Sequence, residues 1–495
     1  MHKQLWRLSS LAVFLNRPLK LFLVIFIVAC MFVQSFLQPT EAAETGERLL
    51  VGAAAGNITP WLGISINGSM RDRKATHIHD QLYARCLVLD NGSTRVAIVV
   101  CDSCLIPREI FDQAKQMVQE HTGLQTNHML MAATHTHFAP TAAPAFQSMP
   151  DPEYRHFLTV RIADTVRCAI DNLVPGRIGW GVGRESKQVF NRRWHMKPGT
   201  IPPDPFGRTI DQVKMNPKRG DPNLVKPAGP TDPDVTVISL QSVEGRPLAL
   251  LANYTLHYVG GTDPGHVSAD YFGMFANRIR KLLGADLLDP PFVGILTNGA
   301  SADVNNIDFR AKPKRRHPYE QMGMVTDAVA SEAFRVVQKI QYHQRIPLTI
   351  RQAEIQLSVR RPGETEVRQA ENIVANLKGK SARTLEEIYA KETIDLSKYP
   401  DRVELIIQAM RIGEVGMVAI PCEVFVEIGL ELKKKSPFKT TFVVELANGY
   451  NGYLPTLAQH KLGGYETWRA KSSYLEVDAA PKIVDLALEL LNHIK

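Results

Sequence analysis

Short apolar runs typical of β-strands alternate with helical segments along most of the sequence from Leu49 onward. In the first half, strand-like runs at 95–100 and 128–133 are each followed by a helical run, at 108–121 and 153–173. This alternation is typical of α/β folds, in which helices cover the faces of a sheet. We therefore predict an α/β fold with a single large domain, in which a mixed sheet is flanked by helices.

The second half continues the pattern and adds two irregular segments. Strand-like runs lie at 235–240, 248–256 and 292–296, and a helical pattern at 271–283 separates the last two. Residues 191–233 are rich in Pro, Gly and basic residues without a hydrophobic period, which predicts a long surface loop that could act as a lid. Residues 360–399 carry two charged helical patterns and are expected to form a peripheral helical insertion.

The N-terminal segment 1–43 has the composition of a leader. Four basic residues precede an uncharged apolar run at 21–33, and the small residues Ala42 and Ala43 follow it. This order fits a secretory signal peptide cleaved near Ala43, while the absence of charge as far as Leu37 leaves an N-terminal membrane anchor open. Both alternatives predict export, to the periplasm, the medium or the outer side of a membrane, with 44–495 as the mature domain.

The charge pattern argues against a nucleic-acid partner, although the formal net charge is +8 at pH 7. The densest basic cluster, at 312–316, contains no aromatic residue that could stack on a base. An exported basic protein meets anionic lipid head groups first, so association with a membrane surface is the partnership that this charge favours.

The cysteines do not predict a disulfide framework, because five of them lie outside the leader and five is an odd number. Cys101 and Cys104 are spaced as C-x-x-C, but no second pair of Cys or His residues accompanies them, as a zinc knuckle would require. We expect buried thiols at both positions.

Two histidines directly after an apolar run give the strongest local signal of chemistry. They stand in Thr134-His135-Thr136-His137, after the run at 129–133. Because successive side chains of a strand point to opposite faces, His135 and His137 are predicted to lie on one face and address one site. Imidazole is a common metal ligand and an acid or base near neutral pH. The alternative is a pair of hydrogen-bonded strand histidines.

Other polar residues also stand where strand-like runs end. His257 follows one such run, and Glu423 begins a helical pattern after another. A glycine-rich turn at 448–453 follows a third run and is expected to expose Tyr450 and Tyr453. In α/β folds the ends of strands collect functional residues, so these positions are candidates for one site.

The order of these motifs resembles that of the neutral/alkaline non-lysosomal ceramidases, from about Val51 to the C-terminus. The family shows an Asp-Ile-Thr-Pro-like opening, a His-Thr-His motif, an Asn-Arg pair, a lone His, a Gly-Asp-x-Ser-Pro motif, a Gly-Glu strand end and a Gly-Tyr turn. This sequence has each motif or a variant of it in the same order: Asn57-Ile58-Thr59-Pro60, His135-Thr136-His137, Asn191-Arg192, His257, Ala302-Asp303-Val304-Asn305-Asn306, Glu423 and Gly452-Tyr453. The joint match is far more specific than any single motif.

The resemblance implies a zinc site and the side chains around it. Four residues match the family's zinc ligands: His135, His257, Glu423 and Tyr453. Three match residues that act on the substrate: the active-site histidine His137, the tyrosine Tyr465 and the arginine Arg192. Two imidazoles, a carboxylate and a phenol oxygen are a donor set that suits Zn²⁺. The resemblance therefore implies an exported hydrolase that uses metal-activated water to cleave the amide bond of an N-acyl lipid, such as a sphingolipid, or of a small-molecule amide.

Two departures from the family pattern leave the substrate open. Asn305 replaces the characteristic serine, and an amide can orient substrate or water but cannot act as a nucleophile. Ser301 is close in sequence but out of register with the motif. The chain also stops where the family's catalytic domain stops, without the immunoglobulin-like C-terminal domain of its longer members. The alternatives are a zinc esterase or lactonase-like hydrolase on a non-ceramide substrate, and a metal-containing binding protein without turnover.

Overall fold

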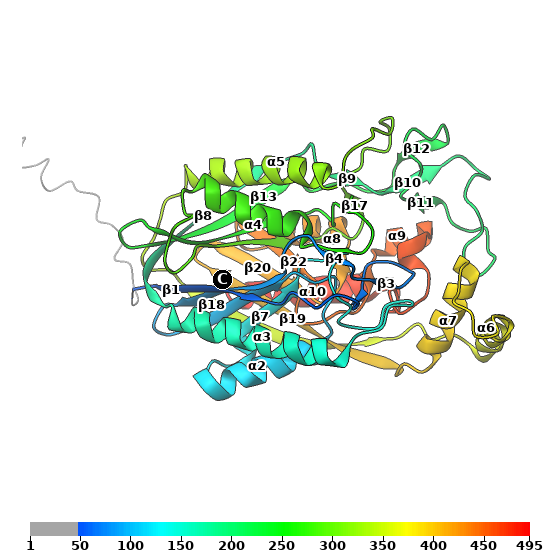
Figure 1. Ribbon diagram of the computed structural model, residues 1–495, viewed down its shortest axis with the longest axis horizontal. Helices are drawn as coiled ribbons and strands as arrows, with labels where there is room; N and C mark the ends of the chain where they lie inside the picture. The colour runs from blue at the N-terminus through cyan, green and yellow to red at the C-terminus, as the bar shows by residue number, and fades with distance from the viewer. Residues whose placement is uncertain (1–47) are drawn as a thin grey trace, which may run out of the picture. The chain divides into compact units, whose positions relative to one another are not determined.

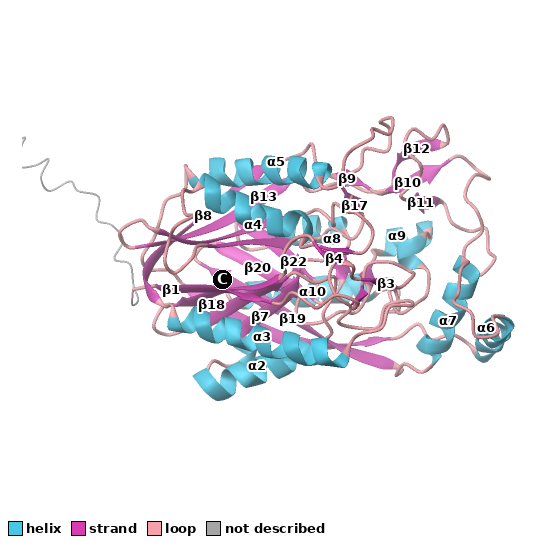
Figure 2. Cartoon of the chain, viewed as in Figure 1, coloured by secondary structure: helices cyan, strands magenta, loops and turns pink. Residues whose placement is uncertain are grey.

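The computed structural model describes residues 48–495, and the predicted leader at 1–43 lies outside this range. The described residues form an α/β domain with two sheets and flanking helices (Figures 1 and 2). The predicted fold class is confirmed, and the second sheet is an addition that the sequence did not indicate. Among residues 48–495, the structure contains no helix with the length and hydropathy needed to cross a membrane.

Eight strands form the larger sheet. Their order across it is Val293–Asn298 (β16), Pro247–Tyr254 (β14), Asp234–Ser242 (β13), Val174–Arg184 (β8), Leu50–Asn57 (β1), Tyr83–Asp90 (β5), Arg95–Cys101 (β6) and Met129–Ala133 (β7). Neighbouring strands are antiparallel except at the two edges, where β14 pairs with β16 and β6 pairs with β7 in parallel. The sheet is therefore mixed, as predicted.

Four strands form the smaller sheet: Leu348–Ser358 (β18), Arg402–Ile412 (β19), Val415–Ile420 (β20) and Thr440–Glu445 (β22). The inner faces of the two sheets share one hydrophobic core, to which β20 contributes Val415, Met417 and Ala419. The alternate residues Val418 and Ile420 belong to a second core on the outer face. Because both faces of this strand are buried, its sequence is apolar throughout and does not alternate with polar residues.

Helices cover the outer face of each sheet. On the larger sheet these are Arg108–Thr122 (α2), Pro152–Asp171 (α3), Asp270–Leu282 (α4) and Glu320–Val337 (α5). On the smaller sheet they are Val426–Lys435 (α8) and Ala479–His493 (α10). In Figure 1, α2 and α3 run along the lower part of the domain, and α4 and α5 along the upper part. The described residues thus form a four-layer α/β/β/α sandwich.

The segment 191–233 is not the continuous surface loop that its composition predicts. Part of it folds into a small three-stranded sheet made of Arg193–Met196 (β10), Val213–Met215 (β11) and Leu224–Pro227 (β12). Its buried residues Trp194 and Met196 pack with Phe309 in a separate small cluster. Such short strands are stabilised by their neighbours and show too few apolar positions to produce a period in the sequence.

The segment 360–399 forms two helices, Glu364–Asn376 (α6) and Leu385–Ser397 (α7), which lie at one end of the domain (Figure 1). They connect β18 to β19, and the strand residues that flank the insertion, Ser358 and Arg402, are paired with each other. The insertion therefore leaves and re-enters the smaller sheet at one place.

Short ladders fix the loops that follow the long strands. They pair His77–Ile78 (β4) with His266–Val267 (β15), Phe190–Asn191 (β9) with Val304–Asn305 (β17), Ser65–Ile66 (β2) with Arg73–Lys74 (β3), and Glu423–Val424 (β21) with Tyr453–Leu454 (β23). Three short helical segments are also present: Thr126–His128, Leu457–Leu462 (α9) and Tyr465–Thr467. Most of the polar residues singled out in the sequence lie in or beside these ladders.

Candidate metal centre

His135 and His137 converge on one point, but not through strand alternation. β7 ends at Ala133, and His135 has a left-handed backbone conformation with φ of 72°. The Nε2 atoms of the two histidines are 3.2 Å apart and their rings are nearly perpendicular, at 87°. The expectation of an extended strand at these residues is therefore wrong, because a left-handed residue turns the chain. Such a conformation in a non-glycine residue costs about 1–2 kcal/mol and is often found at functional sites.

His257 and Glu423 form with His135 a buried group of three side chains that could hold a metal ion. His257 Nε2 lies 3.1 Å from His135 Nε2, and Glu423 Oε2 lies 3.3 Å from the same atom. The three residues follow β7, β14 and β20, so both sheets contribute to the group. Each of the three residues is at most 3% exposed.

Hydrogen bonds orient the lone pairs of the histidines toward one point. His135 Nδ1 donates to the carbonyl of Cys104 at 2.7 Å, and His137 Nδ1 donates to the carbonyl of Gly68 at 2.9 Å. A carbonyl only accepts, so each neutral ring carries its lone pair on Nε2. Glu423 Oε2 is also buried and has no hydrogen bond within the described part of the chain. Acceptors that face one another in this way need a proton or a metal ion between them, so these residues fit a metal ion.

The charges at the group favour a positive charge at its centre. Burial alone would lower the pKa of His135, but the Glu423 carboxylate raises it well above its usual value. Burial would raise the pKa of Glu423, but His135 and Arg192 lower it. The pKa values of His137 and His257 are well below the usual value because both rings are buried and face positive neighbours. The positive charge that Glu423 favours at His135 is a proton in the metal-free protein, and a bound metal ion would replace that proton, since a ligating imidazole must be neutral.

Tyr453, Arg192 and Tyr465 lie next to Glu423. Arg192 Nη2 donates to the Tyr453 hydroxyl at 3.1 Å, and its Nε donates to Glu466 at 3.2 Å. The Tyr465 ring packs edge-on against the Tyr453 ring, with 5.7 Å between centroids. The structure therefore brings together the seven residues that match the family's zinc ligands and substrate-side residues.

The turn at 448–453 is not exposed as the sequence suggests. Tyr453 is 6% exposed, and Tyr450 is half-buried with its hydroxyl donating to Glu423 Oε1 at 3.0 Å. The backbone amide of Tyr453 donates to the carbonyl of Ser472, so a later segment of the chain covers the turn. That contact is distant in sequence and leaves no local signal.

A cavity of about 740 Å³ opens onto this group. The end of the cavity is lined by His135, His137, Arg192, Glu423, Tyr453 and Tyr465. Apolar side chains line another part of its wall: Met70, Leu105, Pro107, Ala143, Phe146 and Met149. Its size lies in the range of pockets that bind small organic molecules.

Asn305 does not belong to the lining of this cavity. Its Nδ2 donates to Asn216 Oδ1 at 2.8 Å, and its Oδ1 accepts from the amide of Ile307 at 2.9 Å. The second contact is the turn-forming bond that asparagine often makes with the backbone two residues on. Asn216 does line the cavity, so Asn305 stands one residue behind the wall. Ser301 is fully buried, and its hydroxyl donates to Glu445 at 2.7 Å.

Asp303, in the same motif, positions Arg192. The carbonyl of Asp303 accepts from the amide of Arg192 at 2.7 Å, and its carboxylate accepts from Asn191 Nδ2 at 2.7 Å. The other carboxylate oxygen accepts from the amide of Val426, the first residue of α8, at 2.9 Å. Burial raises the pKa of Asp303 to about 6. The motif thus connects Asn191 and Arg192 to α8, one of the helices that cover the smaller sheet.

Two residues that hold His137 were missed in the sequence. The Tyr258 ring stacks on the His137 ring, with 3.7 Å between centroids. Gly68 accepts from His137 and packs so closely that a Cβ at this position would lie 2.4 Å from the Cβ of His137. Asn67-Gly68 is readable as a turn, but nothing in the sequence shows that this turn faces His137.

Cys101 and Cys104 are buried free thiols, as expected. Cys104 nevertheless takes part in the group through its backbone carbonyl, which holds His135. Its Sγ lies 3.8 Å from His135 Nδ1. A backbone contact of this kind leaves no trace in residue type, so the sequence could not predict it.

Comparison with known proteins reveals the fold. No protein-family model and no curated protein matches the sequence. The structure matches that of the neutral ceramidase from Pseudomonas aeruginosa with a TM-score of 0.68 at 16% identity, over 90% of this chain and 74% of that chain. It also matches a ceramidase complexed with C2, with a TM-score of 0.68 at 15% identity, over 90% of this chain and 75% of that chain. The chain therefore has the neutral ceramidase-like fold that its motif order implies.

Proposed function

We propose that this protein is a zinc-dependent hydrolase that cleaves the amide bond of an N-acyl lipid or a related amide. The observation that carries the proposal is the cavity of about 740 Å³, partly apolar, whose lining includes the imidazoles of His135 and His137 and the buried carboxylate of Glu423. The third imidazole, His257, lies next to this lining, with its Nε2 3.1 Å from His135 Nε2. The fold supports it, because the structural neighbours are ceramidases. An acyl chain suits the apolar wall, and the amide would then lie at the polar end.

His135, His257, Glu423 and Tyr453 are the residues that would hold Zn²⁺, since nitrogen and oxygen donors of this kind suit a borderline cation. When bound, zinc would polarise the substrate carbonyl and activate a water molecule. Arg192 supports the donor set by holding the Tyr453 hydroxyl at 3.1 Å.

His137 is the residue best placed to move a proton. Gly68 fixes its Nδ1, and Tyr258 holds its ring by stacking, so Nε2 is directed to the end of the cavity. Tyr465 lines the same end, and its hydroxyl would donate to the oxygen that gains negative charge during amide cleavage. Arg192 adds a fixed positive charge next to these groups.

The outer wall of the cavity is charged and suits the polar part of an amphiphile. Lys471 forms ion pairs there with Glu392 at 3.3 Å and with Asp395 at 2.8 Å, and Lys398 lies beside them. Export through the leader at 1–43 would bring the enzyme to lipids outside the cytoplasm. The net charge of +8 would favour a membrane surface with anionic head groups.

A substrate panel tests the activity. Purified, zinc-loaded protein is incubated with ceramide, other N-acyl lipids, simple amides and esters of the same acyl chains, and products are identified by mass spectrometry. We expect release of the fatty acid from an N-acyl lipid, loss of this activity in His135→Ala, and normal activity in His156→Ala, an exposed histidine of α3. Cleavage of esters alone would make the protein an esterase, and no turnover of any substrate would refute a hydrolase.

Metal analysis tests the donor set. We expect one zinc ion per chain to remain tightly bound after dialysis of the wild type and of His156→Ala. The variants His135→Ala and His257→Ala should lose it, because each removes one of the donors that face a common point. Full zinc content in both variants, with normal folding, would show that the ion is held elsewhere.

A further inference from the structure

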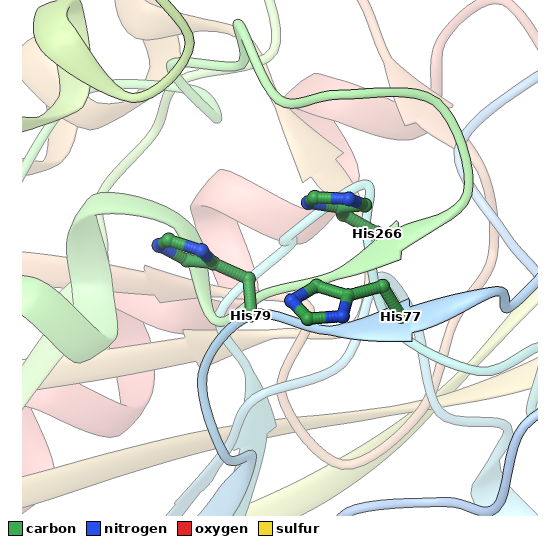
Figure 3. A group of neighbouring side chains, drawn as sticks. All are labelled: His77, His79 and His266. Carbon is green, nitrogen blue, oxygen red and sulfur yellow. The ribbon is translucent and has the colours of Figure 1, made fainter.

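Three histidines gather at the β4–β15 ladder, outside the lining of the cavity (Figure 3). His77 and His79 are exposed, and His266 is half-buried. Each offers one ring nitrogen, and these three atoms lie within 4.8 Å of one another. Neither the sequence motifs nor the proposed hydrolysis uses these residues.

The register of the ladder explains why the three rings meet. His77 pairs with His266, and Ile78 pairs with Val267, in parallel. Ile78 and Val267 pack into the core of the larger sheet, so the alternate residues His77, His79 and His266 must point outward. Figure 3 shows the three imidazoles gathered on one side of the two strands. Two histidines spaced i, i+2 with a third directly across the ladder form a compact set of nitrogen donors.

Tyr319 contacts two of the three histidines. Its hydroxyl lies 2.6 Å from His266 Nδ1, and its ring stacks on His79 with 3.6 Å between centroids. Metal-binding histidines commonly have their second nitrogen hydrogen-bonded in this way, which leaves the first nitrogen directed at the ion. Tyr319 also has a left-handed backbone conformation, with φ of 66°, a strain that accompanies functional positions.

Two carboxylates act on this tyrosine. Burial and the carboxylates of Asp263 and Asp80 raise the pKa of Tyr319 to about 12. Asp80 is held in place by Ser268 Oγ at 2.6 Å and by the amide of Ala269 at 2.7 Å. Carboxylates next to a cluster of imidazoles favour a bound cation.

We infer that His77, His79 and His266 bind a divalent cation of the zinc class, at a second site separate from the candidate metal centre. Three imidazoles suit zinc and the neighbouring transition metals, and do not suit magnesium or calcium. Tetrahedral zinc needs its nitrogen ligands about 3.3 Å apart, which exposed side chains reach by small rotations.

The site would connect two loops of the catalytic cavity. β4 follows the β2–β3 hairpin, which contains Gly68 and Arg73, and Arg73 donates to the carbonyl of His137 at 2.9 Å. β15 follows the loop that contains His257 and Tyr258. A metal ion across the ladder would therefore restrain the hairpin that holds His137 and the loop that contains His257.

Equilibrium dialysis of the full chain against micromolar Zn²⁺, followed by metal analysis, tests the inference. We expect the wild type to hold one more zinc ion per chain than the double variant His77→Gln/His79→Gln. His121→Gln, an exposed histidine of α2, is the matched control and should hold as much zinc as the wild type. Equal zinc content in the wild type and the double variant would overturn the inference. Zinc bound at His135 does not affect this comparison, because the wild type and the double variant both keep that site.

Two further measurements separate a built site from loose adsorption on surface histidines. Tyr319→Phe removes only the hydroxyl and should weaken zinc binding at this site about tenfold. Occupation of the site should also slow backbone hydrogen exchange in 66–80 and 257–268 in the wild type and not in the double variant. Unchanged affinity in Tyr319→Phe together with unchanged exchange would show adsorption only.

Discussion

Two backbone carbonyls determine how individual histidines of the candidate metal centre can act. The carbonyls of Cys104 and Gly68 each accept a hydrogen bond from an Nδ1 atom, and so direct Nε2 of His135 and of His137 to the same point. The orientation of each ring therefore depends on the backbone path of the loops at Cys104 and Gly68 more than on the side chains of these loops. The chemistry at this point therefore depends on loop conformation, which a substitution can disturb without touching a histidine.

Asn305 is a residue at which the structure suggests a supporting role. We expect Asn305→Ala to lose about 1–2 kcal/mol of stability, because it removes the hydrogen bonds to Asn216 and to the amide of Ile307. Of Asn305 and its two partners, only Asn216 lines the cavity, so kcat/KM should fall by less than about tenfold. Urea denaturation and steady-state kinetics on the best substrate of the panel measure the two effects.

Removal of a hydrogen-bond donor that stabilises an oxyanion typically lowers kcat by about 100-fold to 1,000-fold. A loss of that size in Asn305→Ala, at unchanged stability, would contradict the placement behind the cavity wall and give the amide a direct part in the reaction. Asn305→Ser, which restores the serine of the resembled motif, should not increase ceramide hydrolysis if the position stays behind Asn216.

At the scale of elements, the loop between β2 and β3 depends on a glycine. Gly68→Ala places a Cβ 2.4 Å from the Cβ of His137, so the loop or the imidazole must move. A displacement of about 1 Å at a catalytic group lowers activity by about 100-fold. We expect a loss of that size in Gly68→Ala, measured as kcat/KM, with zinc still bound.

Gly63→Ala is the matched control for this variant. Both glycines have positive φ, 86° for Gly63 and 91° for Gly68, but no atom lies within 4 Å of a Cβ at Gly63. The control therefore carries the backbone strain of about 1 kcal/mol without the contact, and should keep its activity. Equal losses in the two variants would attribute the effect to strain and not to the position of His137.

Elements with a strong local pattern could be predicted from the sequence, and contacts between distant segments could not. The run predicted at 108–121 matches α2, Arg108–Thr122, because its apolar positions recur with the helical period. The pairing of β18 with β19 spans the inserted helices, and no local pattern encodes such a partner. For the same reason the sequence suggested which histidines matter, but gave a wrong backbone conformation at His135.

At the scale of the whole molecule, a buried polar chain joins three layers of the sandwich. Lys115 of α2 donates to Asn448 Oδ1 at 2.8 Å, and Asn448 Nδ2 donates to Gln408 of β19 at 3.2 Å. The amide of Met131 in β7 also donates to Asn448, at 3.3 Å. Lys115 is only 2% exposed, and its burial lowers its pKa to about 8.

This lowered pKa predicts how stability changes with pH. Between about pH 8 and the unfolded value near 10.4, the unfolded chain binds more protons at Lys115 than the folded chain. The free energy of unfolding should therefore rise with pH in this window, by up to about 3 kcal/mol from this group. Urea unfolding of the wild type and of Lys115→Met at several pH values isolates the effect. A stability difference between the two proteins that stays constant over the window would contradict it.

The α6–α7 insertion and the sandwich contribute different parts of the cavity wall. Its helix α7 supplies Glu392 and Asp395 to the wall of the cavity, whereas the sandwich supplies the residues of the candidate metal centre. Because the insertion starts and finishes beside the paired residues Ser358 and Arg402, its length and sequence can change while the register of the sheet is kept. An exchange of this insertion can therefore alter the charged part of the cavity wall while the candidate metal centre stays unchanged.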